Sequence, residues 1–279
     1  MRFALAIALG LSATVSYADL PWSPTIRTAL VLSSKSRQPI LVRVLSPFGS
    51  PVFPAAASSS DLEEAMRHFT LVRASSYDEL RTILPALPAA GGPGLVMLDS
   101  NGRLLKRHGG FVHDVDIFYI VSRTQWRISH EDKIRALAQK NPSNPNLNGD
   151  LATLAAMDGD LGRAGNLFTQ YSKKMDVSHR VAALEAMGDE WRMRGDFLNA
   201  IHAYRGALTN PMPSDAAGRL RVHLTLCLLR NGDPNGASAE ISKVKGYLAS
   251  SPLASYVGVI RKRIFQTTLA PRMGRPAAR

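Results

Sequence analysis

The chain of 279 residues has one cysteine, Cys227, and fewer acidic than basic side chains. One thiol cannot form an intramolecular disulfide, so we expect the fold to depend on its apolar core. Cys227 stands in the apolar run 224–229 and is predicted to be a buried, inert thiol. The formal net charge is +12, which favours anionic lipid, cell-wall polymer or an acidic protein as partner over nucleic acid if the chain is exported. A basic, solvated surface without a dedicated partner is the simpler interpretation.

Long hydrophobic runs are missing except at the start of the chain. Arg2 precedes an apolar stretch of about 13 residues, and the small residues Ser16 and Ala18 follow it. This pattern predicts a secretory signal peptide, residues 1–18, cleaved after Ala18. The stretch is shorter than the roughly 20 residues of a membrane-spanning helix, although an uncleaved anchor is the alternative.

Motifs that carry chemistry are also missing. The histidines are scattered without metal-ligand spacing, and the chain has neither a nucleophile elbow nor a phosphate-binding glycine loop. We therefore predict no catalytic residue, no metal site and no cofactor. The paired carboxylates Glu63–Glu64 and Asp189–Glu190 are expected on exposed helix faces, where water solvates them.

The first half alternates between helical and strand patterns. Strands are predicted at 39–45, 70–74 and 95–98, and a hairpin is predicted around Asn101–Gly102, a strong two-residue turn signal, with its second strand at 104–107. Helices are predicted at 25–33, at 60–69, from the capping box Ser76–Glu79 to about 84, and at 115–123.

This β-α-β-α-β-β-α order resembles the thioredoxin fold, with Pro93, Asn101–Gly102 and Gly109–Gly110 in the places of the family's cis-proline, hairpin turn and glycine. The family's Cys-x-x-Cys is absent, because 46–54 contains no cysteine. Disulfide exchange requires sulfur, so the sequence argues against dithiol–disulfide oxidoreductase activity. The resemblance implies a peptide groove beside Pro93, unless this proline only ends a loop and begins a strand.

The second half contains an internal repeat. A helix capped by Ser129 and running to Lys140 is predicted first, followed by a polar linker at 141–146. Beyond it, Gly-Asp pairs recur at 159–160, 195–196 and 232–233. Each pair is followed at constant spacing by an alanine and then a large apolar residue: Ala164 and Phe168, Ala200 and Tyr204, Ala237 and Ile241. A period of 36 to 37 residues predicts stacked helical hairpins.

The repeat resembles the tetratricopeptide repeat, most clearly in its middle copy, which keeps Leu184, Gly188, Trp191, Ala200, Tyr204 and Ala207. The resemblance implies a concave face formed by the first helix of each copy, suited to a peptide or helix of another protein. Carried over by position, that face comprises Glu185, Asp189, Arg192, Met193, Val222, Leu226 and Arg230. Ordinary solvated side chains are the alternative.

Together these patterns predict an α/β thioredoxin-like domain at 19–127, an all-α tetratricopeptide-like domain at 128–250, and a terminal helix with a basic tail at 251–279. The expected function is a non-catalytic periplasmic protein-binding module, such as an assembly factor or accessory chaperone for another exported protein. Two alternatives are an accessory of a thiol-redox or cytochrome maturation pathway, and an envelope-associated protein whose tail contacts anionic membrane.

Export predicts a defined mature terminus. The mature protein should begin at Asp19, because signal peptidase reads the small residues at 16 and 18. Intact-mass measurement of protein purified from the periplasm checks this. A species that retains Met1 would contradict cleavage, and replacement of Ala18 by a bulky residue should abolish processing.

Overall fold

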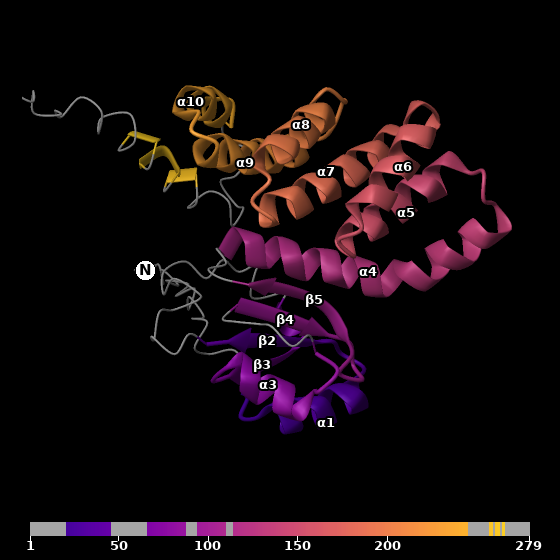
Figure 1. The fold of residues 1–279 in the computed structure, drawn as a ribbon, viewed down its shortest axis with the longest axis vertical. Coiled ribbons are helices and arrows are strands. Elements are labelled where there is room, and N and C mark those ends of the chain that lie inside the picture. The colour runs from indigo at the N-terminus through magenta and orange to yellow at the C-terminus, as the bar shows by residue number, and fades with distance from the viewer. Residues whose placement is uncertain are drawn as a thin grey trace, which may run out of the picture.

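The described part of the chain runs from a β-sheet into a series of helices (Figure 1). The computed structural model describes residues 21–45, 66–87, 94–109, 114–244, 257–258, 260–262 and 264–265. The strands are β1 (Trp22–Ser23), β2 (Ile40–Val44), β3 (Thr70–Ala74), β4 (Gly94–Leu98) and β5 (Leu104–Gly109). The helices are α1 (Ile26–Ser36), α3 (Tyr77–Ile83), α4 (Asp114–Lys140), α5 (Pro145–Met157), α6 (Leu161–Tyr171), the short 3₁₀ helix η2 (Ser172–Lys174), α7 (Val177–Met193), α8 (Phe197–Leu208), α9 (Ser214–Arg230) and α10 (Pro234–Ser242).

The five strands form one mixed sheet in the order β1-β3-β2-β4-β5. β1, β3 and β2 are parallel, whereas β4 pairs antiparallel with both β2 and β5. The predicted hairpin is confirmed. Its turn is held by Asp99, whose Oδ1 accepts the N–H groups of Asn101 and Arg103, each at 2.9 Å.

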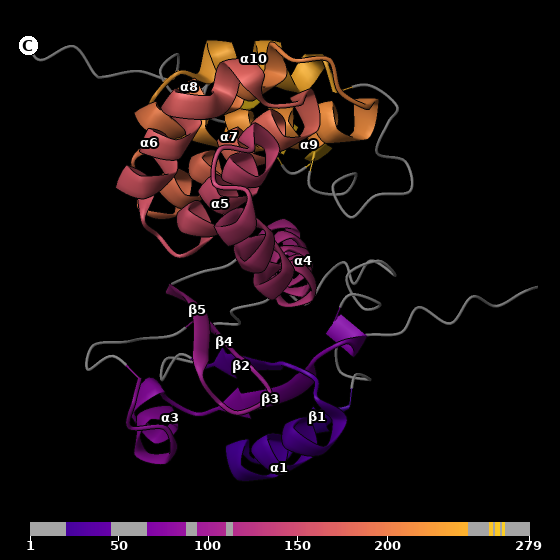
Figure 2. The same cartoon turned by 90° about the vertical axis from the view of Figure 1, so that its right-hand side faces the viewer.

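Alternating side chains cover the two faces of the sheet, as the pleat of a strand requires. Ile40, Val42 and Val44 of β2 pack with α1 and α3 on one face, whereas Leu41 points to the other. On that second face lie the buried residues of α4, namely Ile117, Ile120 and Val121. In Figures 1 and 2, α4 accordingly lies between the sheet and helices α5 to α10, whereas α1 and α3 lie on the other side of the sheet.

α4 corrects one prediction. Two separate helices were expected at 115–123 and 129–140, yet a single helix runs from Asp114 to Lys140 and contains the predicted domain boundary at 127. Ser129 does not cap a helix, because its hydroxyl donates to the carbonyl of Gln125 one turn earlier. Glu131 bonds Arg127 and Arg135, the pairing that i,i+4 spacing favours inside a helix.

The repeated Gly-Asp pairs form the turns of three helical hairpins, α5–α6, α7–α8 and α9–α10. The three glycines have φ of 82°, 79° and 80°, the left-handed conformation that ends a helix. Each following aspartate caps the next helix: Asp160 accepts the N–H of Arg163, Asp196 that of Asn199 and Asp233 that of Gly236. The predicted helical repeat is therefore confirmed as hairpins.

Small residues bring the paired helices close together. Ala164, Ala200 and Ala237 are fully buried. A Cβ added at Gly188 of α7 would lie 2.7 Å from the ring of Tyr204 on α8, so this contact requires glycine. The hairpin core also contains Cys227, confirming its predicted burial, and Val257, Ile260 and Ile264.

The described residues therefore form an α/β part followed by a helical part. Residues 1–20, the cysteine-free segment 46–54, Pro93 and the tail after 265 lie outside the described residues. Among the described helices, none has both the length and the apolar composition needed to cross a bilayer.

Replacement of glycine by alanine should have opposite effects on stability in a hairpin turn and inside a helix. Gly195→Ala should lower the free energy of unfolding by about 1 kcal/mol, because alanine is strained at positive φ. Gly165→Ala, inside α6 with open space around the added methyl, should raise it by about 0.5–1 kcal/mol. Urea denaturation measures both, and the same sign for the two variants would contradict the assigned turn.

Candidate functional site

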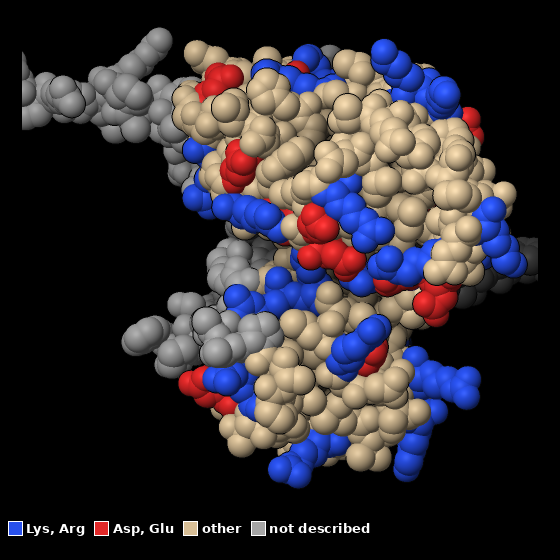
Figure 3. All heavy atoms as spheres, turned by 45° about the vertical axis from the view of Figure 1, so that its right-hand side comes forward, with Lys and Arg blue, Asp and Glu red and all other residues tan. Residues whose placement is uncertain are grey.

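Ion pairs join the sheet side of the molecule to the hairpins. Their cations come from β5 and α4, and their carboxylates come from α7 and the turn after α5. Lys106 Nζ lies 2.7 Å from Glu190 Oε2, and Arg127 Nη1 lies 2.8 Å from Asp158 Oδ1. Arg123 Nη2 lies 3.2 Å from Asp189 and 3.5 Å from Glu185. We call these contacts the interlayer ion pairs. Figure 3 shows charged side chains gathered between the sheet side and the hairpins.

Asp189 is the most connected carboxylate of the interlayer ion pairs. It is 4% exposed, the Tyr204 hydroxyl donates to it at 2.6 Å, and Nδ1 of the fully buried His223 lies 3.2 Å away. Burial alone raises the pKa of Asp189, but His223 and Arg123 outweigh it, so this pKa lies well below the usual range. Burial and Asp189 together raise the pKa of Tyr204, which keeps its hydroxyl protonated as a donor.

Glu185 lies one helical turn before Asp189 and is also buried. Nε of Arg219 on α9 donates to Glu185 at 2.8 Å. Burial opposes ionisation, yet Arg219 and Arg123 hold the pKa of Glu185 below its usual value. Neither Glu185 nor Asp189 has the raised pKa that a carboxyl group needs for acid catalysis near neutral pH. Their role here is to receive cations from neighbouring elements.

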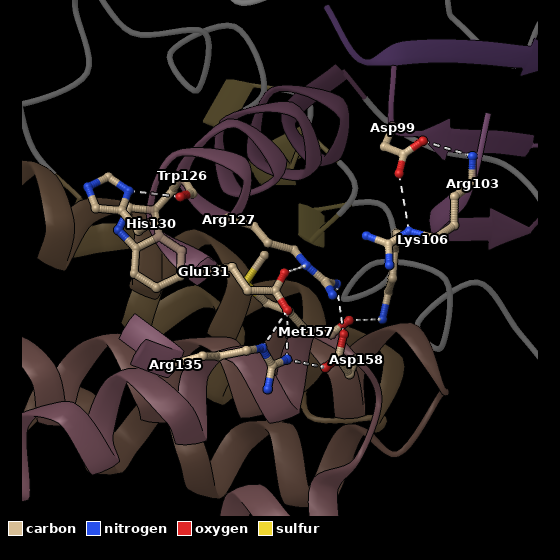
Figure 4. A network of polar contacts seen from close by, with 10 residues as sticks. All are labelled: Asp99, Arg103, Lys106, Trp126, Arg127, His130, Glu131, Arg135, Met157 and Asp158. Carbon is tan, nitrogen blue, oxygen red and sulfur yellow. Dashed lines mark hydrogen bonds and ion pairs between the residues drawn. The ribbon is translucent and has the colours of Figure 1, made fainter. Parts of the chain in front are cut away.

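A second group of ion pairs and hydrogen bonds surrounds the turn after α5 (Figure 4). Glu131 bridges Arg127 and Arg135, and both arginines also reach Asp158, at 2.8 and 3.6 Å. Lys106 donates to the carbonyl of Met157 at 2.8 Å. The β5 strand, α4 and the first hairpin are thus tied together within one small region.

A recess of about 550 Å³, its open mouth included, lies beside the interlayer ion pairs. It is bounded by β5, α4, α5 and α7. Its apolar lining consists of Leu105, Ile120, Ala156, Met157, Ala186 and Met193. Met193 is 39% exposed, so the recess opens onto a solvated apolar side chain at the end of α7.

Charged side chains surround the recess. Four cations line it, Lys106, Arg123, Arg127 and Arg192, against the two carboxylates Asp189 and Glu190. Within the part of the chain that the structure describes, no three His, Cys, Asp or Glu side chains are grouped to hold a metal ion.

The structure divides the residues predicted for partner binding. Arg192 and Met193 line the recess, and Arg230 is exposed at the end of α9 outside it. Glu185 and Asp189 are buried against the chain's own arginines, as described above. Val222 is buried, Leu226 is half-buried, and Pro93 lies outside the described residues.

One sequence expectation about these carboxylates is wrong. Asp189 and Glu190 were expected on a solvated face, yet they are 4% and 7% exposed. The reason is that α4 and β5 cover this side of α7 with Arg123 and Lys106. Nothing in the sequence marks these two cations, because arginine and lysine on a helix or strand usually face water.

Comparison with known proteins found no match. No protein-family model, no curated protein and no solved structure is detectably similar to this chain.

The interlayer ion pairs predict an acid-sensitive stability. Asp189→Asn should lower the free energy of unfolding near pH 7 by about 3 kcal/mol, because it leaves buried cations uncompensated. A carboxyl group whose pKa is lowered on folding stabilises above its unfolded pKa, and this contribution is lost as pH falls through the folded value. The gap between wild type and Asp189→Asn should therefore narrow below about pH 4, the usual pKa of aspartate.

Urea denaturation at several pH values measures this gap. Asp215→Asn, at an exposed carboxylate in the first turn of α9, is the control and should change stability by less than about 1 kcal/mol. A gap that stays constant from neutral to acidic pH would show that the ionised form of Asp189 contributes nothing.

Proposed function

We propose that this chain is an exported, non-catalytic protein-binding module. In this proposal a thioredoxin-like unit without redox cysteines is joined to tetratricopeptide-like hairpins, and the hairpins bind a segment of another exported protein in the periplasm. An assembly factor or accessory chaperone would have this activity. Export rests on the signal-peptide pattern at 1–18.

The arrangement of the sheet supports the thioredoxin-like part. Two parallel strands connected through a segment of chain, β2 and β3, are followed by α3, an antiparallel hairpin and then α4. This is the order on which the sequence resemblance was based. Helices on both faces of the sheet agree with it.

The observation that carries the binding role is the recess at the inner side of α7. The first hairpin helices α5 and α7 face α4 and β5, and the recess between these elements opens at Met193. Stacked hairpins bury a continuous core and leave one face for other molecules. Here α4 occupies part of that face, and Arg192 and Met193 remain beside the open part.

Loss of a bound protein on substitution at the helix ends tests this proposal. Tagged wild-type protein should recover a specific protein from periplasmic extract, and Arg192→Gln combined with Arg230→Gln should reduce its recovery at least about tenfold. Arginines at interfaces often carry much of the binding energy, and glutamine removes their charge at similar length. Quantitative mass spectrometry of the recovered proteins measures the difference.

Arg205→Gln on α8 is the matched control, because Arg205 is also exposed but belongs to the second helix of its hairpin. It should leave recovery unchanged. Circular dichroism verifies that each variant is folded. Equal recovery by the double variant, or no specific protein with wild type, contradicts the proposal.

A further inference from the structure

The recess combines a mainly apolar surface with a surplus of positive charge. Leu105 from β5, Met157 from α5 and Met193 from α7 approach it from three elements. Methionine side chains adapt to different apolar shapes, which suits a site that receives a side chain from another molecule.

Positive side chains still outnumber negative ones when the charged residues bonded to the lining residues are counted as well. The lining cations Lys106, Arg123, Arg127 and Arg192 face the lining carboxylates Asp189 and Glu190. The carboxylates Glu185, Glu131 and Asp158 join this network from outside the lining, and three further arginines join it as well. Arg219 pairs with Glu185, Arg135 with both Glu131 and Asp158, and Arg194 with Glu190. Each added negative charge is thus matched by an added positive one.

We infer that this recess binds an acidic peptide segment of the partner protein, seating one large apolar side chain among Leu105, Met157 and Met193, with flanking carboxylates toward the lining cations. This inference rests on the proposed function. Low-dielectric walls strengthen the attraction between such carboxylates and a cationic pocket. A second copy of this chain, with a net charge of +12, and the chain's own basic tail are both poorly matched to a cationic recess.

Selection from a phage-displayed library of random short peptides tests the chemistry without knowledge of the partner. Full-length protein should enrich peptides in which Leu, Met or Phe stands next to Asp or Glu. A synthetic peptide of the enriched sequence, with both ends blocked, should then bind in calorimetry, and the affinity should fall as salt rises because added ions screen the charges.

Met193→Glu should weaken that peptide at least about tenfold, since it removes an apolar contact and repels carboxylates. Met193→Leu, which keeps an apolar side chain, should bind within about threefold of wild type. Leu198→Glu is the matched control on α8, where Leu198 is 56% exposed and outside the lining of the recess. It should bind like wild type.

The inference is overturned by enrichment of basic or uncharged sequences, by no enrichment at all, or by equal binding of wild type and Met193→Glu. A dimer that forms with rising concentration and is lost in Met193→Glu would identify a second copy as the occupant, which also overturns it. If the proposed partner is still recovered from periplasm and lost on the Arg192 and Arg230 changes, the protein-binding function stands and only the assigned ligand chemistry fails.

Discussion

The rest of the structure depends on the contact of Arg123 with Asp189 and Glu185. Two carboxylates buried one turn apart on α7 are costly to remove from water, so they require cations in direct contact. Arg123 provides one from α4, and Arg219 on α9 provides another to Glu185. The buried carboxylates of the hairpins are therefore fully neutralised only when α4 lies against them. Packing of the sheet side against the hairpins thus stabilises the hairpins themselves.

α4 is the element that makes this possible. Its first half buries Ile117, Ile120 and Val121 against the sheet, and its later turns carry the charges that meet the first hairpin. A continuous helix fixes the direction of one layer relative to the other in a way that a flexible linker does not. The recess lies where the two layers meet. The binding site proposed above is thus a result of how the two layers are joined.

Local elements were well predicted where local chemistry decides them. The strands around 40, 72 and 96 follow from short apolar runs, and the hairpin follows from Asn101–Gly102. The three hairpin turns follow from Gly-Asp, because glycine accepts positive φ and aspartate caps the next helix. The continuity of α4 was missed because Ser129, followed by the acidic residues Glu131 and Asp132, resembles the start of a helix. The physical difference is that Glu131 found arginines on its own helix face.

By itself, the sequence determined the succession of an α/β part and repeated helical hairpins, since periodicity and turn residues act over a few positions. It also located Arg192 and Met193 on the first helix of the middle hairpin. Only the tertiary structure decided that Glu185, Asp189 and Glu190 are buried and that Lys106 and Arg123 neutralise them. The reason is that burial of a charge depends on which distant element covers it, and the pairs formed here join residues 62 to 84 positions apart.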